Sequence, residues 1–292
     1  MKKPQWITIA AAVILTLAIF IFGRTIPEKQ VVVTHQEGDG HDHDIQPAIT
    51  IDTILLLAKK ELTATQLSRI AILEEDLEVR KKNLSPGASI EEPLHVYHQL
   101  ARFWADTARV FEPFAWYRAE AARLENSEKN LTFAARLFLE NLQSDEVMPR
   151  RQWKALQAKD LFERALKINP ANDSAKVGIG AAYLFGNISS APMEGILKIR
   201  EVADKDSTNL YAQMTLAKGS MISGQYDKAI TRLQSVNRIK PGNLEAVLLL
   251  ADVYERMNDK KNAMEWYRKS LQLTSEPALL AAIQERIDEL GK

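Results

Sequence analysis

The sequence predicts an all-α fold in which antiparallel helix hairpins stack into a solenoid. The chain repeats at a step of 34 residues, so that Ala229 recurs as Ala263 and Gly224 as Asn258. A fixed step of this length is typical of helix-turn-helix repeats. Small or compact residues also recur where the two helices of one hairpin would touch, at Ala101, Ala135, Gly180, Ala217 and Ala251 in the first helices and at Pro113, Ala158, Gly195, Ala229 and Ala263 in the second.

Residues 1–24 are predicted to form an N-terminal transmembrane helix. The uncharged apolar run 6–23 would be roughly 27 Å long as a helix, which is enough to cross a bilayer core. A cleaved signal peptide would also follow Lys2 and Lys3, but the run ends around Phe22 without the small residues that cleavage needs. The positive charges at the start place the N-terminus in the cytoplasm and the repeats in the periplasm or outside. This predicts a single-pass protein of the inner (cytoplasmic) membrane that contacts the lipid bilayer through residues 6–23.

Residues 25–47 are predicted to form a flexible tether, because they are polar, rich in glycine and lack helical periodicity. His35, His41 and His43 stand among carboxylates in this segment. Imidazole and carboxylate groups can bind a borderline metal such as zinc or nickel. A solvated spacer explains the same composition, since a flexible loop loses conformational entropy when it forms a metal site. No cofactor is predicted elsewhere in the chain.

Residues 48–93 do not fit the 34-residue pattern and are predicted to form an atypical capping helix pair. One helix lies around 51–62, and the next begins after a capping box made by Thr63 and Gln66. A third helix is expected to start at a second capping box that begins with Ser89. The end units of a solenoid must cover the exposed face of the neighbouring repeat, which is the role that we expect for this pair.

About five repeats occupy residues 94–277, and a C-terminal capping helix follows at 278–292 with Ser275 as its predicted N-cap. The units are 94–127, 128–172, 173–209, 210–243 and 244–277. The second unit carries eleven extra residues. They correspond to about three helical turns, which we expect to lengthen both helices around a tip at 144–149. A basic segment follows this tip, with Arg150, Arg151, Trp153 and Lys154. It either binds nucleic acid or acidic lipid headgroups or forms a solvated helix face with one buried ring.

Composition narrows the function further. The chain has 38 basic and 38 acidic residues and a formal net charge of zero, which argues against a general nucleic-acid partner. It has no cysteine, which excludes a thiol catalyst and a disulfide framework. Gly178 and Gly180 lack the preceding strand of a dinucleotide-binding turn, and His95 and His98 lack a third metal ligand at helical spacing. We therefore do not expect an enzyme.

The best-matched repeat motifs are Gly224, Gln225, Tyr226, Asp227, Lys228, Ala229 and Ile230 with the closing Pro241, and Asp252, Val253 and Tyr254 with Ala263, Met264, Glu265, Trp266 and Tyr267. These motifs resemble the tetratricopeptide repeat (TPR) family. The resemblance implies a right-handed α-solenoid whose concave surface is lined by the first helix of each hairpin. With its predicted anchor, the chain is similar in architecture to bacterial membrane-anchored TPR proteins.

The concave positions that the resemblance implies predict a peptide-binding groove lined by Arg102, Arg136, Leu184, Phe185, Tyr211, Met214, Lys218, Met221, Ile222 and Leu248. The middle of this set is apolar and its front is basic. We therefore expect a peptide with an apolar stripe and an acidic end near Arg102 and Arg136. The alternative is that Leu184, Phe185 and Ile222 pack against the following hairpin or are covered by the terminal helix.

Two functions follow from this pattern. The first is a membrane-anchored scaffold that binds a client protein or peptide in its groove and assists the assembly or recruitment of a complex at the cell envelope. The second is a metal-handling protein that uses the tether, with the repeats as a docking module. The pattern does not predict the oligomeric state or the client, because a fold does not name its ligand.

Overall fold

The computed structural model describes residues 49–83, 89–188 and 192–292, all of which belong to one compact unit, His43–Lys292. The predicted anchor, 1–24, and tether, 25–47, lie outside the described residues and stay predictions. Within the described ranges, none of the helices combines the length and the apolar character that a membrane crossing requires.

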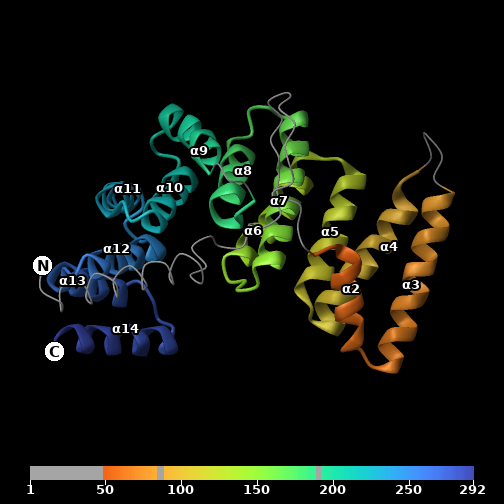
Figure 1. The fold of residues 1–292 in the computed structure, drawn as a ribbon, viewed down its shortest axis with the longest axis horizontal. Coiled ribbons are helices and arrows are strands. Elements are labelled where there is room, and N and C mark those ends of the chain that lie inside the picture. The colour runs from red at the N-terminus through yellow and green to blue at the C-terminus, as the bar shows by residue number, and fades with distance from the viewer. Residues whose placement is uncertain (1–48, 84–88, 189–191) are drawn as a thin grey trace, which may run out of the picture. The chain divides into compact units, whose positions relative to one another are not determined.

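The described part of the chain is all-α, as predicted, with thirteen α-helices and one π-helical segment (Figure 1). In chain order these are α2 (Ile51–Lys60), α3 (Ala64–Lys82), α4 (Glu91–Arg102), η1 (Phe103–Ala108), α5 (Phe111–Glu125), α6 (Glu128–Leu142), α7 (Met148–Ile168), α8 (Asp173–Gly186), α9 (Met193–Lys205), α10 (Leu210–Ile222), α11 (Tyr226–Ile239), α12 (Leu244–Arg256), α13 (Lys260–Leu271) and α14 (Pro277–Leu290).

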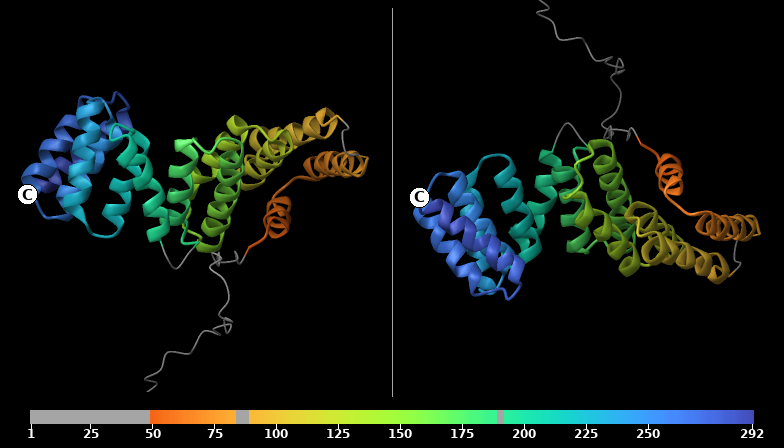
Figure 2. Two further views of the ribbon diagram at one scale, coloured as in Figure 1. Left: turned by 90° about the horizontal axis from the view of Figure 1, so that it is seen from above. Right: turned by 90° about the horizontal axis from the view of Figure 1, so that it is seen from below.

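The helices pair as hairpins, and the hairpins stack in chain order (Figure 2). The pairs are α4 with α5, α6 with α7, α8 with α9, α10 with α11, and α12 with α13. Each second helix also packs against the first helix of the next hairpin, and α6 contacts α8 just as α8 contacts α10. This nearest-neighbour packing confirms the predicted solenoid.

The small residues of the 34-residue pattern lie where the helices touch. All ten of the positions predicted for them are buried. One close approach joins α8 to α9, where a Cβ added to Gly180 would lie 2.5 Å from the backbone oxygen of Gly195. A side chain larger than hydrogen has no room there, which explains why glycine replaces alanine in this hairpin.

Asparagine side chains start three successive first helices. Asn172, Asn209 and Asn243 each accept a hydrogen bond from the backbone N–H three residues later, at 2.8 to 3.0 Å. This contact satisfies one of the free N–H groups at the helix start and sets where each first helix begins.

Of the three N-caps predicted from the sequence, one is confirmed and two are wrong. Thr63 and Gln66 form the complete capping box at the start of α3. Ser89 does not cap α4, which begins at Glu91 without a side-chain cap, although the Ser89 hydroxyl accepts from the Glu91 N–H at 3.3 Å. Ser275 likewise does not cap α14, because the helix begins at Pro277 after Glu276. In both cases the helix starts later than predicted, so the serine stands one residue before the N-cap position, which Ile90 and Glu276 occupy.

The extra residues of the second repeat lie mainly in one helix. α7 has 21 residues, whereas α6 has 15. The prediction that both helices lengthen was therefore wrong, because the chain turns directly after Leu142 and the added turns extend the returning helix. The start of α7 lies beside the C-terminal end of α8, where Nε2 of Gln152 donates to the backbone oxygen of Asn187 at 3.0 Å.

Candidate binding groove between the hairpins

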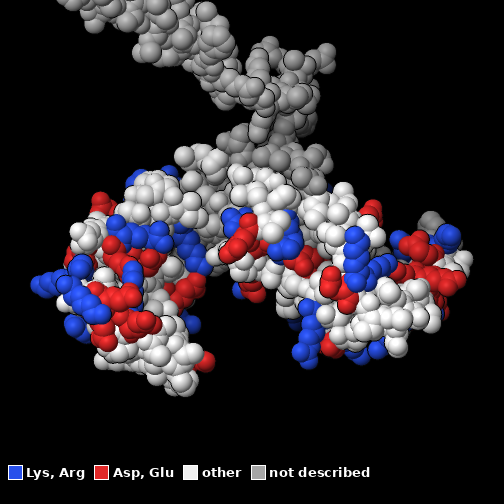
Figure 3. Space-filling model, turned by 60° about the horizontal axis from the view of Figure 1, so that its bottom comes forward, with Lys and Arg blue, Asp and Glu red and all other residues white. Residues whose placement is uncertain are grey.

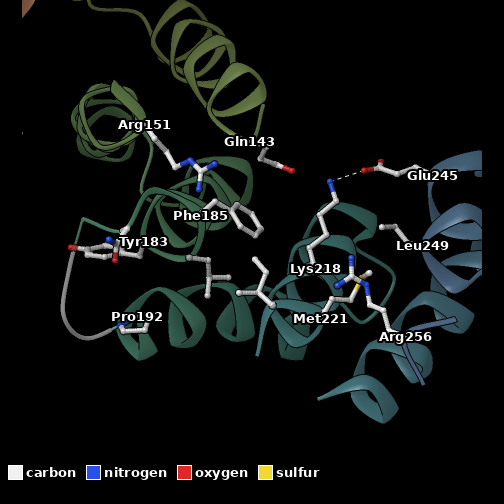
Figure 4. Close-up of a pocket in the computed structure, with 13 residues that line it drawn as sticks. Gln143, Arg151, Tyr183, Phe185, Pro192, Lys218, Met221, Glu245, Leu249 and Arg256 are labelled. Carbon is white, nitrogen blue, oxygen red and sulfur yellow. Dashed lines mark ion pairs between the residues drawn. The ribbon is translucent and has the colours of Figure 1, made fainter. Parts of the chain in front are cut away.

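Two adjoining cavities lie between the first helices of the repeats. The larger has a volume of about 830 Å³ and is lined mainly by the C-terminal ends of α8 and α10 and by one face of α12 (Figure 4). The smaller, of about 340 Å³, is lined mainly by α6, α8 and α10. Both are lined by Gln143, Phe185, Lys218 and Glu245. Because the cavities share these residues, we treat them as one surface and call it the groove.

Eight of the ten residues predicted for the binding surface line the groove, namely Arg136, Leu184, Phe185, Tyr211, Met214, Lys218, Met221 and Ile222. Arg102 instead lines a separate cavity of about 490 Å³ with Arg69 and Asp106. The expectation that Arg102 and Arg136 face one acidic group was therefore wrong. Leu248 lines neither cavity of the groove, whereas its neighbour Leu249 lines the larger one.

The apolar wall of the groove comes from the ends of α8 and α10. Leu184 packs partly against α10, where a Cβ on Gly219 would lie 3.1 Å from its Cδ1 atom. The alternative that this residue packs against the following hairpin is therefore partly right. Ile222, in contrast, is 70% exposed, so the next hairpin does not cover it. The terminal helix α14 packs against α13 and contributes no residue to the lining.

Most cations of the groove already have a partner. Lys218 pairs with Glu245 at 2.6 Å, and Arg256 pairs with Asp252 at 2.9 Å. The guanidinium of Arg136 lies over the ring of Tyr211, 5.9 Å from its centroid, and 3.8 Å from a carboxylate oxygen of Glu140. Burial raises the pKa of Tyr211 to about 12, with Arg136 acting against the rise. The tyrosine is therefore neutral at physiological pH and offers an O–H group and a ring.

Arg151 is the exception among these cations. It comes from the start of α7 and points into the groove, as Phe185 does (Figure 4). Its Nε donates a hydrogen bond to the backbone oxygen of Asp145 at 2.9 Å. No carboxylate within the described ranges pairs with it. The remaining donors of its guanidinium group are thus available to an anion.

Asp145 holds this arginine in place. Its carboxylate accepts two hydrogen bonds from Arg150 and one from Lys154, at 2.6 to 2.8 Å, and one from the backbone N–H of Val147 at 3.0 Å. Burial alone would raise the pKa of Asp145, but these hydrogen bonds outweigh burial and hold the pKa well below its usual value. Lys154 is itself buried and also pairs with Glu112 at 2.7 Å.

The basic segment after the tip is therefore not a solvated helix face. Trp153 and Lys154 are both buried, and Arg150 is paired with Asp145. Arg150 and Lys154 both pair with Asp145, and these ion pairs fix the start of α7. Only Arg151 of this set lines the groove.

Gln143, Arg151 and Leu249 are among the lining residues of the groove that were not predicted from the sequence. Arg151 was missed because only first helices were considered, although the insertion carries the start of a second helix to the groove. Its signal was the eleven-residue insertion followed by a basic segment. Leu249 was missed because a register error of one residue rotates a helical position by about 100°.

The residues considered for other chemistry occupy ordinary helical places. Gly178 and Gly180 lie inside α8, packed against Phe162 and Ile199. His98 lies 3.5 Å from Glu125, and His95 contacts Gln99 within α4. The described ranges hold no cluster of three metal-ligating side chains. The histidines of the tether lie outside them, so the metal-handling alternative stays a prediction.

Acidic and basic side chains are interspersed on the face shown in Figure 3. Short-range pairs such as Arg164 and Asp160, 3.0 Å apart on α7, recur among the described residues. The interspersed pattern agrees with the zero formal charge of the chain.

A tetratricopeptide repeat family model matches residues 220–287. The structure is similar to that of TTC0263, a thermophilic TPR protein from Thermus thermophilus, with a TM-score of 0.50 and 13% identity over 68% of this chain and 98% of that chain. It is also similar to YrrB, which is described as a TPR protein with an unusual peptide-binding site, with a TM-score of 0.41 and 15% identity over 73% of this chain and 97% of that chain.

A third similar structure is a fragment of MamA from Desulfovibrio magneticus RS-1, with a TM-score of 0.42 and 20% identity over 62% of this chain and 94% of that chain. No curated protein sequence matches the chain significantly. At these identities the structural likenesses concern the fold alone. The tetratricopeptide repeat assignment is thus supported by sequence over residues 220–287 and by fold over 68% of the chain.

Proposed function

We propose that this protein binds a peptide segment of a client protein in the groove, and that the segment places a carboxylate on Arg151 and apolar side chains against the neighbouring wall. The observation that carries the proposal is the position of Arg151, a cation without a carboxylate partner among the described residues, beside an apolar cavity of about 830 Å³. An apolar groove with a few convergent polar groups is the usual form of a binding site.

The apolar wall suits a side chain of the client. Leu184, Phe185, Met221 and Leu249 line the larger cavity, and exposed Ile222 stands at its edge. Contiguous apolar surface that faces water marks interaction sites more often than it occurs by chance. Methionine adapts its shape at low cost, so Met221 suits a surface that accepts more than one apolar side chain.

Charge complementarity favours an acidic client over a basic one. Glu245 is already paired with Lys218, so it offers little attraction to a cation. Arg151 and Arg136 both gain from an added anion, because the only carboxylate near Arg136 among the described residues lies 3.8 Å away. Interface charges of this kind select the partner and speed its approach more than they add raw affinity. We infer binding rather than catalysis.

We further propose that the protein works as a scaffold at the cell envelope of a bacterium, held by residues 6–23 in the inner membrane with the repeats on the periplasmic side. The support is the uncharged apolar run and the two lysines that precede it. Extraction of membranes with alkaline carbonate checks this proposal, since an anchored chain stays in the pellet. Release of the full-length protein into the supernatant would contradict the anchor without bearing on the groove.

The test of the groove starts from a random-peptide display library selected on the full-length protein. We expect the enriched peptides to combine apolar residues with an aspartate or glutamate. Binding of one enriched peptide is then followed by fluorescence anisotropy. Arg151→Gln should weaken it at least tenfold, which is within the usual range for a charge-assisted hydrogen bond. Arg164→Gln is the matched control, because it removes the same charge from an exposed pair on the same helix.

Two results would contradict the proposal. One is a selection that enriches no peptide. The other is an enriched peptide whose binding is unchanged in both Arg151→Gln and Phe185→Ala, with circular dichroism showing that both variants are folded.

A further inference from the structure

A further cavity, which we call the hollow, lies away from the groove on one face of α11. It has a volume of about 410 Å³ and is lined by Gln213 of α10 together with Asp227, Lys228, Thr231, Arg232, Ser235 and Arg238. Residues three, four and seven apart share one face of a helix, so the basic and hydroxyl side chains of α11 form a single stripe. No residue of this stripe lines the groove.

Arg232 is built into this hollow by a buried amide. Its Nη1 donates a hydrogen bond to Oε1 of Gln213 at 2.9 Å. Gln213 is only 7% exposed, and its Nε2 donates to the backbone oxygen of Ser207 at 3.1 Å. The amide therefore has no freedom to turn away, and the guanidinium is held at the wall of the hollow rather than extended into solvent.

The same guanidinium has no carboxylate partner among the described residues. Burial lowers the pKa of Arg232, and the like charge of Arg200 lowers it further, while Asp204 acts in the opposite direction. A partly buried cation beside a second cation is an unfavourable arrangement, which a bound anion relieves. Arg238, also on the hollow, likewise has no ion pair in the described part of the chain.

We propose that the hollow on α11 binds a phosphate group. The lining offers three cationic side chains, Lys228, Arg232 and Arg238, against one carboxylate, Asp227. A dianion matches this positive excess better than a single carboxylate does. Phosphate also presents more acceptor oxygens than a carboxylate, and it accepts from a guanidinium fork and a hydroxyl such as that of Ser235 together.

Two sources carry a phosphate group, a free or small-molecule phosphate as a dianion and the headgroup of an anionic phospholipid as a monoanion, and the charge of the lining favours the first. Inorganic phosphate is the probe for the first. It is titrated into the full-length protein by isothermal calorimetry. For the second, the probe is sedimentation with vesicles of phosphatidylglycerol, with phosphatidylcholine vesicles as the reference. We compare the fraction of protein bound to phosphatidylglycerol vesicles after subtraction of the fraction bound to phosphatidylcholine vesicles. This subtraction removes binding that results from insertion of the N-terminal segment into either bilayer.

We expect Arg232→Gln to weaken phosphate binding or the phosphatidylglycerol excess at least tenfold. Arg232→Lys keeps the positive charge but loses the planar guanidinium group. Its affinity should therefore lie between that of Arg232→Gln and that of the wild type. Arg268→Gln, an exposed arginine on α13, is the control and should bind like the wild type. Saturation by inorganic phosphate assigns the free source, whereas a response to vesicles alone assigns the headgroup.

The proposal is overturned if neither probe binds, or if Arg232→Gln binds as the wild type does. Thermal melting of each variant shows whether it is folded. Because the hollow and the groove share no residue, loss of phosphate binding in Arg232→Gln should leave binding of the enriched peptide unchanged.

Discussion

Nζ of Lys218 lies 2.6 Å from Oε1 of Glu245, which joins α10 to α12 at the meeting point of the two cavities (Figure 4). The lysine side chain is 25% exposed and the glutamate side chain 57% exposed, so water screens the pair. Such a pair contributes about 1 kcal/mol or less to folding. Its larger effect is on the charge of the groove, because it occupies Lys218 and leaves Arg151 as the cation open to a ligand.

Removing the carboxylate of this pair should strengthen the binding of an acidic peptide. Glu245→Gln releases Lys218, so we expect affinity for the enriched peptide to rise by about threefold to tenfold at low salt and the gain to shrink as salt screens the charge. Fluorescence anisotropy at low and high salt measures both effects. The control is Glu201→Gln, which breaks the 2.5 Å pair with Lys176 outside the groove. An equal gain in the control would refute the explanation.

The contact between α8 and α9 should not tolerate a methyl group. In Gly180→Ala, the new Cβ would meet the backbone oxygen of Gly195 at 2.5 Å and the side chain of Ile199. Overpacking of this kind costs about 1–3 kcal/mol of unfolding free energy. Gly242→Ala has open space around its Cβ and should change stability by less than about 1 kcal/mol. Urea denaturation compares the two, and equal midpoints would show that the contact is not tight.

The support of Arg151 should be sensitive to pH. The folded pKa of Asp145 lies below its unfolded value, so the ionised carboxylate stabilises the fold above the unfolded pKa of about 3.9, and this contribution disappears as pH falls toward the folded pKa. Asp145→Asn leaves buried Lys154 with one carboxylate fewer and should cost about 3 kcal/mol at pH 7. The difference from the wild type should narrow below about pH 4.

Denaturation at several pH values measures this trend. Asp76→Asn is the reference, because it breaks an exposed pair with Arg80 and should cost about 0.5 kcal/mol or less. A cost for Asp145→Asn that does not change between pH 7 and pH 3 would contradict the assigned pKa direction.

Two adjacent leucines of α12 should differ in their effect on binding. Leu249 lines the larger cavity and Leu248 does not. We therefore expect Leu249→Ala to weaken binding of the enriched peptide about tenfold, the effect of a lost buried apolar group, whereas Leu248→Ala leaves it near the wild-type value. Thermal melting identifies any general loss of folding. The reverse order would place the groove on the other face of α12.

The hairpins could be predicted from the sequence, because the close contacts between their helices require small residues and these recur every 34 residues or so. Gly180 and Gly195 form one such contact. The sequence also indicated eight lining residues of the groove. It did not reveal the partner of each charge. That Arg151 is unpaired while Arg150 is not depends on how the chain folds around Asp145, which no periodic pattern records. The asparagine caps of α8, α10 and α12 were not predicted, although each asparagine stands just before an apolar helix.

The side chains around the groove come from segments far apart in the chain, from Arg136 to Arg256. In a linear array each hairpin holds only its neighbours, so its ends can open while the middle stays folded. A peptide that touches Arg151 and Leu249 together would fasten the second hairpin to the fifth. Amide hydrogen exchange in α9 and α11, which lie between these contacts along the chain, should then slow on binding. The hairpins should also unfold together, in one cooperative transition, instead of unfolding separately from the ends.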